Sequence, residues 1–161
     1  MMIRLAGAGA IAVSGLIWGL YKSETYRCRT VQCMKMMQMI QRIMDYIRYD
    51  GLDVYDIVRE LRTYVEISDF VVDVDIESDF NVSACENVEK HFVNGEERNI
   101  LLELWGQLGS TDSEGQLNKL SGLYERLSRL YEQRTEEYGK YGRLYRSVGL
   151  LLGLMAGIAV I

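Results

Sequence analysis

The chain has 161 residues, enough for one domain, and a formal net charge of −5. Its acidic residues are concentrated at positions 44–97, which hold 15 Asp or Glu against 4 Lys or Arg, a local net charge of −11. Because contacts with phosphates need a basic surface, this charge argues against nucleic acid as a partner.

The chain begins with an apolar stretch from Ile3 to Tyr21, which contains only Arg4 and Ser14 as polar residues. A stretch of about nineteen residues is just long enough to cross a hydrocarbon core about 30 Å thick. We therefore predict a first transmembrane helix at residues 1–21. A cleaved signal peptide is the alternative, but residues 22–25 offer no clear small-residue cleavage site.

A GxGxxA match at residues 7–12 lacks the preceding strand that dinucleotide binding requires.

Residues 22–143 are predicted to form a cytoplasmic helical domain. Ser23 is expected to cap a first helix ending near Arg48, and Asp53 to cap a second helix whose buried stripe reaches Val65. Residues 66–81 are interpreted as a helix end and an acidic loop, although Val71 to Ile76 alternate like a strand.

Two further helices are predicted before the C-terminal one. The first is short and runs from Ser83 to Phe92, and the second is amphipathic and runs from Glu96 to Leu108. The only histidine, His91, has no Ser, Cys or Asp arrangement that would make it a catalyst, so we do not expect an enzyme.

The last fifty residues are predicted to form one helix, which starts at Asp112 or Ser113 and continues into a second transmembrane segment at residues 144–161. Apolar side chains recur along it in steps of three and four residues, interrupted only by Arg134, and we call this row the seam. They are Leu117, Leu120, Tyr124, Leu127, Tyr131, Tyr138, Tyr141 and Tyr145. This helix is either a straight strut or hinged at Gly139 and Gly142.

Both apolar segments carry glycine at four-residue spacing, which places these residues on one face of each helix. They are Gly15 and Gly19 in the first segment and Gly149, Gly153 and Gly157 in the second. We predict that they pack the two spans together, because glycine lets helix backbones approach closely. The alternative is that membrane helices are simply rich in glycine.

Basic residues lie just inside both apolar segments, which predicts a cytoplasmic domain with both termini on the far side of the membrane.

Three cysteines, Cys28, Cys33 and Cys85, form no CxxC motif. We interpret them as thiols in a reducing compartment, and we expect neither a metal site nor a cofactor.

The overall expectation is an all-α protein, with a cytosolic bundle of five or six helices between two transmembrane helices and the long C-terminal helix continuous with the second span.

The segment from Leu104 to Gln116 resembles the stage III sporulation protein AB family. The residues that match its motif are Leu108, Gly109, Asp112 and Gln116. The chain end from Lys140 to Leu154 is also similar to that family. Gly109 is expected to end one helix with a positive φ angle, and Asp112 to cap the next.

The resemblance implies a membrane scaffold in endospore formation, within the complex that links mother cell and forespore. The family is similar to the cytoplasmic domains of type II secretion F proteins, which implies docking of a secretion-type ATPase of the same operon, together with other membrane components of the complex. We expect an acidic docking face for that ATPase. Its residues are Asp69, Asp73, Asp75, Glu77 and Asp79.

Two alternatives remain for these features. The acidic residues are equally compatible with a solvated surface that keeps the protein soluble. A different function would be a small two-span channel with a cytosolic gating domain, but neither apolar segment carries a polar stripe to line water.

Overall fold

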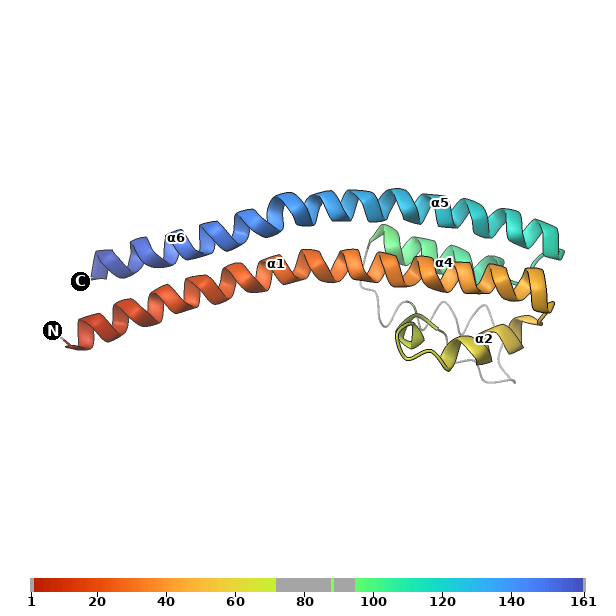
Figure 1. Ribbon diagram of the computed structural model, residues 1–161, viewed down its shortest axis with the longest axis horizontal. Coiled ribbons are helices and arrows are strands. Elements are labelled where there is room, and N and C mark those ends of the chain that lie inside the picture. The colour runs from red at the N-terminus through yellow and green to blue at the C-terminus, as the bar shows by residue number, and fades with distance from the viewer. Residues whose placement is uncertain (1, 72–87, 89–94, 161) are drawn as a thin grey trace. The chain divides into compact units, whose positions relative to one another are not determined.

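The computed structural model describes residues 2–71, residue 88 and residues 95–160, and every element in them is helical (Figure 1). The predicted helix from Ser83 to Phe92 lies outside these residues, as do Cys85 and His91. The predicted all-α class is confirmed for the part of the chain that is described.

Helix α1 runs from Met2 to Asp45 and is followed directly by a π-helix, η1 (Tyr46–Asp50). The structure thus has one continuous helical segment here, whereas we predicted a transmembrane helix followed by a separate, capped helix. Ser23 lies inside it and is only 2% exposed, so its predicted role as a cap is wrong. The physical reason is that residues 21–45 contain neither proline nor glycine, so nothing ends the helix there.

The second helix, α2 (Val54–Arg62), begins after Asp53, whose carboxylate accepts a hydrogen bond from the Val54 amide at 2.8 Å. This confirms the predicted cap. A short 3₁₀ helix, η2 (Ser68–Phe70), follows. Val65 lies beyond the end of α2 and is 84% exposed, so its predicted place in the buried stripe is wrong.

Helix α4 (Glu96–Gln107) leads through a turn into α5 (Ser113–Glu137), a π-helical turn η3 (Tyr138–Gly142) and α6 (Arg143–Val160). The last three elements follow one another without a gap, and the two glycines proposed as a hinge both lie in η3. The residues described thus contain four continuous helical segments and one 3₁₀ turn rather than five or six helices.

Within the residues described, no helix meets the length and apolarity needed to cross a bilayer, so the predicted spans at 1–21 and 144–161 are not found there.

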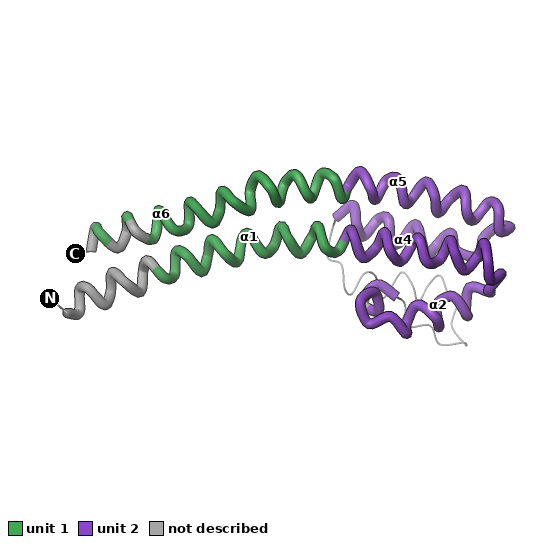
Figure 2. Tube along the Cα trace, in the orientation of Figure 1, with its two compact units in different colours: residues 1–32, 131–161 green, residues 33–130 purple. Residues whose placement is uncertain are grey.

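The chain divides into two compact units (Figure 2). Unit 1 comprises residues 1–32 and 131–161, and unit 2 comprises residues 33–130.

Unit 2 has a conventional apolar core, to which all four of its helices contribute. Completely or almost completely buried residues include Met36, Ile40, Leu61, Leu101, Trp105 and Leu127. The buried face of α5 in this unit is centred on Leu123 as well as Leu127, while Tyr124 from the predicted seam is only half-buried.

Candidate functional site

In unit 1, the glycines of α1 lie against the backbone of α6. A Cβ atom placed on Gly15 would be 2.9 Å from the Gly149 carbonyl oxygen and 2.9 Å from Gly153 Cα. A Cβ atom on Gly19 would be 2.6 Å from the Tyr145 carbonyl oxygen. Because these neighbours are backbone atoms, only glycine permits so close an approach. The structure therefore brings together four of the five glycines that the sequence singled out, and the surroundings of Gly157 are not described.

Aromatic side chains follow the glycine contacts along the same pair of helices. The Trp18 ring meets Tyr145 edge to face, with centroids 6.0 Å apart. Tyr26 stacks with both Tyr141 and Tyr145, each at a centroid distance of 5.9 Å. These distances fall in the range in which aromatic pairs add to the burial of their surfaces. Desolvation, followed by its interaction with the Tyr145 hydroxyl, raises the pKa of Tyr26.

A polar contact joins α1 to α6 near these rings. Arg146 donates from Nε to the Ser23 hydroxyl at 2.9 Å and from Nη2 to the Tyr138 hydroxyl at 3.0 Å. Ser23 is small enough to lie near Gly142, where an added Cβ would be 3.3 Å from the Ser23 hydroxyl oxygen. Ser23, which we predicted to cap a helix, is therefore a contact residue between α1 and α6.

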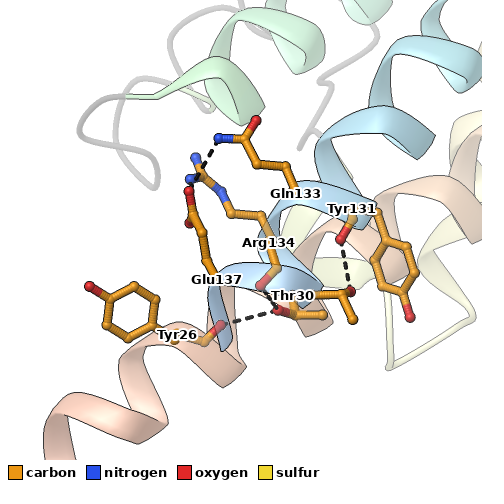
Figure 3. Close-up of polar contacts among 7 residues, drawn as sticks. Tyr26, Thr30, Tyr131, Gln133, Arg134 and Glu137 are labelled. Carbon is orange, nitrogen blue, oxygen red and sulfur yellow. Dashed lines mark hydrogen bonds and ion pairs between the residues drawn. The ribbon is translucent and has the colours of Figure 1, made fainter. Parts of the chain in front are cut away.

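A second polar contact involves the residue that interrupts the predicted seam, Arg134 (Figure 3). Its carbonyl oxygen accepts a hydrogen bond from the Thr30 hydroxyl at 3.1 Å, and that hydroxyl is also 3.2 Å from the Tyr26 carbonyl oxygen. The Arg134 guanidinium donates to the Glu137 carboxylate at 3.0 Å, and Gln133 donates to the same carboxylate at 3.2 Å. The hydrogen bond from Arg134 is the main reason that the pKa of Glu137 is lowered.

In unit 2, the residues that carry the family resemblance build the turn between α4 and α5. Gly109 has a φ angle of 79°, a left-handed conformation that favours glycine, and it follows the end of α4 as predicted. Leu108 is buried beside it. A Cβ atom on Gly109 would be 2.9 Å from a methyl carbon of Val54, so α2 packs directly against this turn.

Gln116 closes the turn through its side chain. Its amide nitrogen donates to the Thr111 carbonyl oxygen at 2.7 Å, and its side-chain oxygen accepts from the Gly109 amide at 3.4 Å. Asp112 immediately precedes α5, and its carbonyl oxygen accepts the Gln116 backbone amide at 2.9 Å. The Asp112 carboxylate accepts a hydrogen bond from the Thr111 hydroxyl at 2.9 Å. The motif thus has a structural explanation as a fixed helix-to-helix turn.

The acidic residues proposed for docking are placed only in part. Asp69 lies in η2, while Asp73, Asp75, Glu77 and Asp79 lie outside the described residues.

A cavity of about 270 Å³ in unit 2 was not anticipated from the sequence. Its lining includes Arg42 of α1 and Tyr64, and the Arg42 guanidinium lies 3.8 Å from the centre of the Tyr64 ring. The Tyr64 and Tyr46 hydroxyls are 3.5 Å apart, and this hydrogen bond, with burial second, raises the pKa of Tyr46 to about 12. No spacing pattern in the sequence links Arg42 to Tyr64, which lies beyond the end of α2.

In the ranges that the structure covers, no group of three His, Cys, Asp or Glu side chains is arranged to hold a metal ion. Cys28 is exposed and Cys33 is buried.

Comparison with known proteins yields one family. The family model described as stage III sporulation protein AB matches residues 4–161. No curated protein and no solved structure gives a significant match.

Proposed function

Because the chain belongs to the stage III sporulation protein AB family, we propose that it is a membrane-anchored adaptor in the complex between mother cell and forespore, where it docks a cytosolic secretion-type ATPase. Membership of the family implies a role in stage III of sporulation, as a structural or assembly component rather than as a known enzyme. The anchor and the docking surface are separate parts of the proposal and rest on different residues.

The observation that carries the proposed anchor is the apolar outer surface of the glycine-packed helix pair. Large apolar side chains of both helices are exposed there, although their backbones are in close contact. They include Val13, Ile17 and Leu20 of α1 and Val148, Leu151, Leu152, Met155 and Ile158 of α6. Contiguous exposed apolar surface of this kind marks a membrane or partner contact. Lipid is the occupant we favour, because glycine packing combined with apolar outer faces is how helices associate in hydrocarbon.

The proposed topology follows from the charges beside this surface. Lys22, Arg27 and Arg29 follow it in α1, and Arg143 and Arg146 precede it in α6. By the positive-inside tendency, residues 22–143 would be cytoplasmic, on the mother-cell side, with both termini across the membrane.

The proposed docking surface for the ATPase is the acidic set Asp69, Asp73, Asp75, Glu77 and Asp79. Its support is the local net charge of −11 over residues 44–97, which would favour a basic partner surface and a fast, specific encounter.

Co-purification of the full chain with that ATPase tests the docking proposal. Replacing Asp73, Asp75 and Glu77 by lysine should abolish co-purification. A matched control reverses Glu114, Glu125 and Glu132, which are exposed on α5, and should retain it. Retention of the ATPase by the folded triple reversal at 73, 75 and 77 would contradict this docking surface.

The channel function has less support. Gly15 against Gly149 and Gly19 against Tyr145 leave no space for a pore between these two helices of one chain. Reproducible conductance of the reconstituted chain in a planar bilayer would overturn the adaptor proposal in favour of the channel.

A further inference from the structure

A group of aromatic and basic residues occupies the part of unit 1 between its apolar surface and its polar contacts, and we name it the collar. Its members come from matching positions of the two paired helices. They are Trp18, Tyr21, Lys22, Tyr26, Lys140, Tyr141, Arg143, Tyr145 and Arg146.

The contacts within unit 1 show that these residues share one level of the helix pair. Gly19 lies beside Tyr145, Ser23 hydrogen-bonds Arg146, and Tyr26 stacks on Tyr141. The eight-residue rise from Trp18 to Tyr26 is about 12 Å along an α-helix. The collar is therefore a band around both helices rather than a set of residues scattered along them.

The surroundings change in character across this band. Toward the termini, the described exposed side chains are predominantly apolar, as at Ile17 and Leu151. In the other direction, the Thr30 hydroxyl joins the two helices by its hydrogen bond to the Arg134 carbonyl oxygen, and Arg134 forms an ion pair with Glu137 on its own helix. Tryptophan and tyrosine concentrate at such boundaries in membrane proteins, because one end of each ring is apolar and the other forms hydrogen bonds.

The basic side chains of the collar are exposed and available to anions. Among the residues described, neither Lys22 nor Arg143 has an ion-pair partner, and the Lys140 ammonium lies 5.6 Å from the centre of the Tyr141 ring. The nearby carboxylate of Glu24 is paired with Arg27 at 2.8 Å. Residues 18–29 and 138–149 together contain six basic residues and one acidic residue, a net charge of +5 in a chain of net charge −5.

We propose that the collar binds the anionic headgroups of phospholipids, with Lys22, Lys140 and Arg143 as the contacting residues. A cluster of basic residues beside a membrane-inserted helix attracts anionic lipids, and the neighbouring aromatic rings hold it at headgroup depth. Arg146 has a different role, because its hydrogen bond to Ser23 joins α6 to α1, while its hydrogen bond to Tyr138 stays within its own helical segment. The proposal rests on the membrane anchor proposed above and adds a lipid selectivity to it.

The fluorescence of Trp18 offers a direct test, because this residue lies in the collar and is about half exposed. The full chain is placed in nanodiscs containing equal amounts of phosphatidylcholine and phosphatidylglycerol. In one preparation only the zwitterionic lipid carries bromine on its acyl chains, and in the other only the anionic lipid does. The Trp18→Phe variant supplies the contribution of Trp105, which is completely buried in unit 2.

The expected result is that brominated phosphatidylglycerol quenches Trp18 at least about twofold more than brominated phosphatidylcholine, and that high salt reduces the difference. The variant Lys22→Gln/Lys140→Gln/Arg143→Gln should be quenched equally by both lipids. A control with the same change in charge, Arg48→Gln/Arg59→Gln/Lys119→Gln, alters exposed residues of unit 2 and should keep the difference.

The outcomes separate this inference from the anchor on which it rests. Equal quenching of the wild-type chain by both lipids, or an unchanged preference in the collar variant, would overturn the headgroup site while leaving the anchor in place. Absence of Trp18 quenching by either lipid would overturn the anchor as well. Helical circular dichroism of each variant establishes that it is folded.

Discussion

The two units of this chain bury opposite kinds of residue. Unit 2 encloses Trp105, Leu104 and Ile40 completely, as a domain surrounded by water does. Unit 1 places Gly19 and Ser23 in its interior and leaves Ile17 59% exposed. In unit 2 the hydrophobic effect accounts for the packing, whereas unit 1 relies on close backbone contact, hydrogen bonds and ring stacking. The buried apolar side chains therefore identify the packing core of unit 2. They do not identify the packing contacts of unit 1, where the large apolar side chains are exposed.

The largest expected effect is the difference in stability loss between a large-to-small substitution in unit 2 and one in unit 1. Leu104→Ala should lower the free energy of unfolding of the full chain by about 2–5 kcal/mol, because it leaves a cavity in a closed core. Ile17→Ala should change it by less than about 0.5 kcal/mol, because this side chain is mostly exposed. Denaturant titration in detergent solution measures both. Equal losses for the two variants would remove the distinction between the units.

Glycine substitutions should show the reverse pattern. Gly19→Ala should cost about 1–3 kcal/mol of stability, because the added methyl group would overlap the Tyr145 carbonyl oxygen. Gly122→Ala in α5 should instead add about 0.5–1 kcal/mol, since nothing lies within 4 Å of the new Cβ atom and alanine favours the helix. The same titration gives both values, and a stabilising Gly19→Ala would show that α1 and α6 are not in backbone contact.

A smaller effect is expected for the buried hydroxyl of unit 1. Ser23→Ala should lower stability by about 0.5–1.5 kcal/mol, because Arg146 loses its hydrogen-bond acceptor. Ser147→Ala, at an exposed position of α6, is the matched control and should be near neutral. If both serine variants unfold at the same midpoint, the contact of Ser23 with Arg146 does not hold the helices together.

The smallest expected effect is a dependence on pH in unit 1. The pKa of Glu137 is lower in the folded chain than in the unfolded chain, so its contribution to stability is present above the unfolded pKa and is lost as pH falls through the folded pKa. Since its carboxylate is partly exposed, this contribution should be below about 1 kcal/mol. Glu137→Gln should reduce the loss of stability between neutral and acidic pH, measured by thermal unfolding. An identical pH profile for the variant would contradict the ion pair with Arg134.

Local features of the fold were predictable where a residue type has one dominant role. Gly109 ends a helix and Asp53 caps one because their backbone and side-chain preferences act within a few residues. Ser23 was misinterpreted because a serine suited to a cap is also tolerated inside a helix, where only its tertiary partner decides its role.

The candidate site was less predictable than the helices around it. The Thr30 hydroxyl meets the Arg134 carbonyl across 104 positions of sequence, and Arg42 meets Tyr64 from a segment with no regular spacing. Such contacts depend on which helix faces pack together. Periodicity in the sequence identifies the apolar face of a helix, but it does not identify the helix that packs against that face. The glycine spacing was the exception, because close approach of two helices admits few other residues.

The π-helical turn η3 has a consequence for insertions and deletions in this chain. It lies between Arg134, which faces Thr30, and Gly149, which faces Gly15. A π-helix takes one more residue per hydrogen-bonded turn than an α-helix, so this turn sets the rotation between the two contacts. Removing a single residue from Tyr138–Gly142 would convert this turn to regular α-helix and leave the rotation of Gly149 relative to Arg134 nearly unchanged, whereas removing one from the α-helix on either side would rotate Gly149 by about 100°. A single-residue deletion is therefore expected to keep both contacts in phase within η3, and to separate them in the α-helix on either side even when it preserves every contact residue.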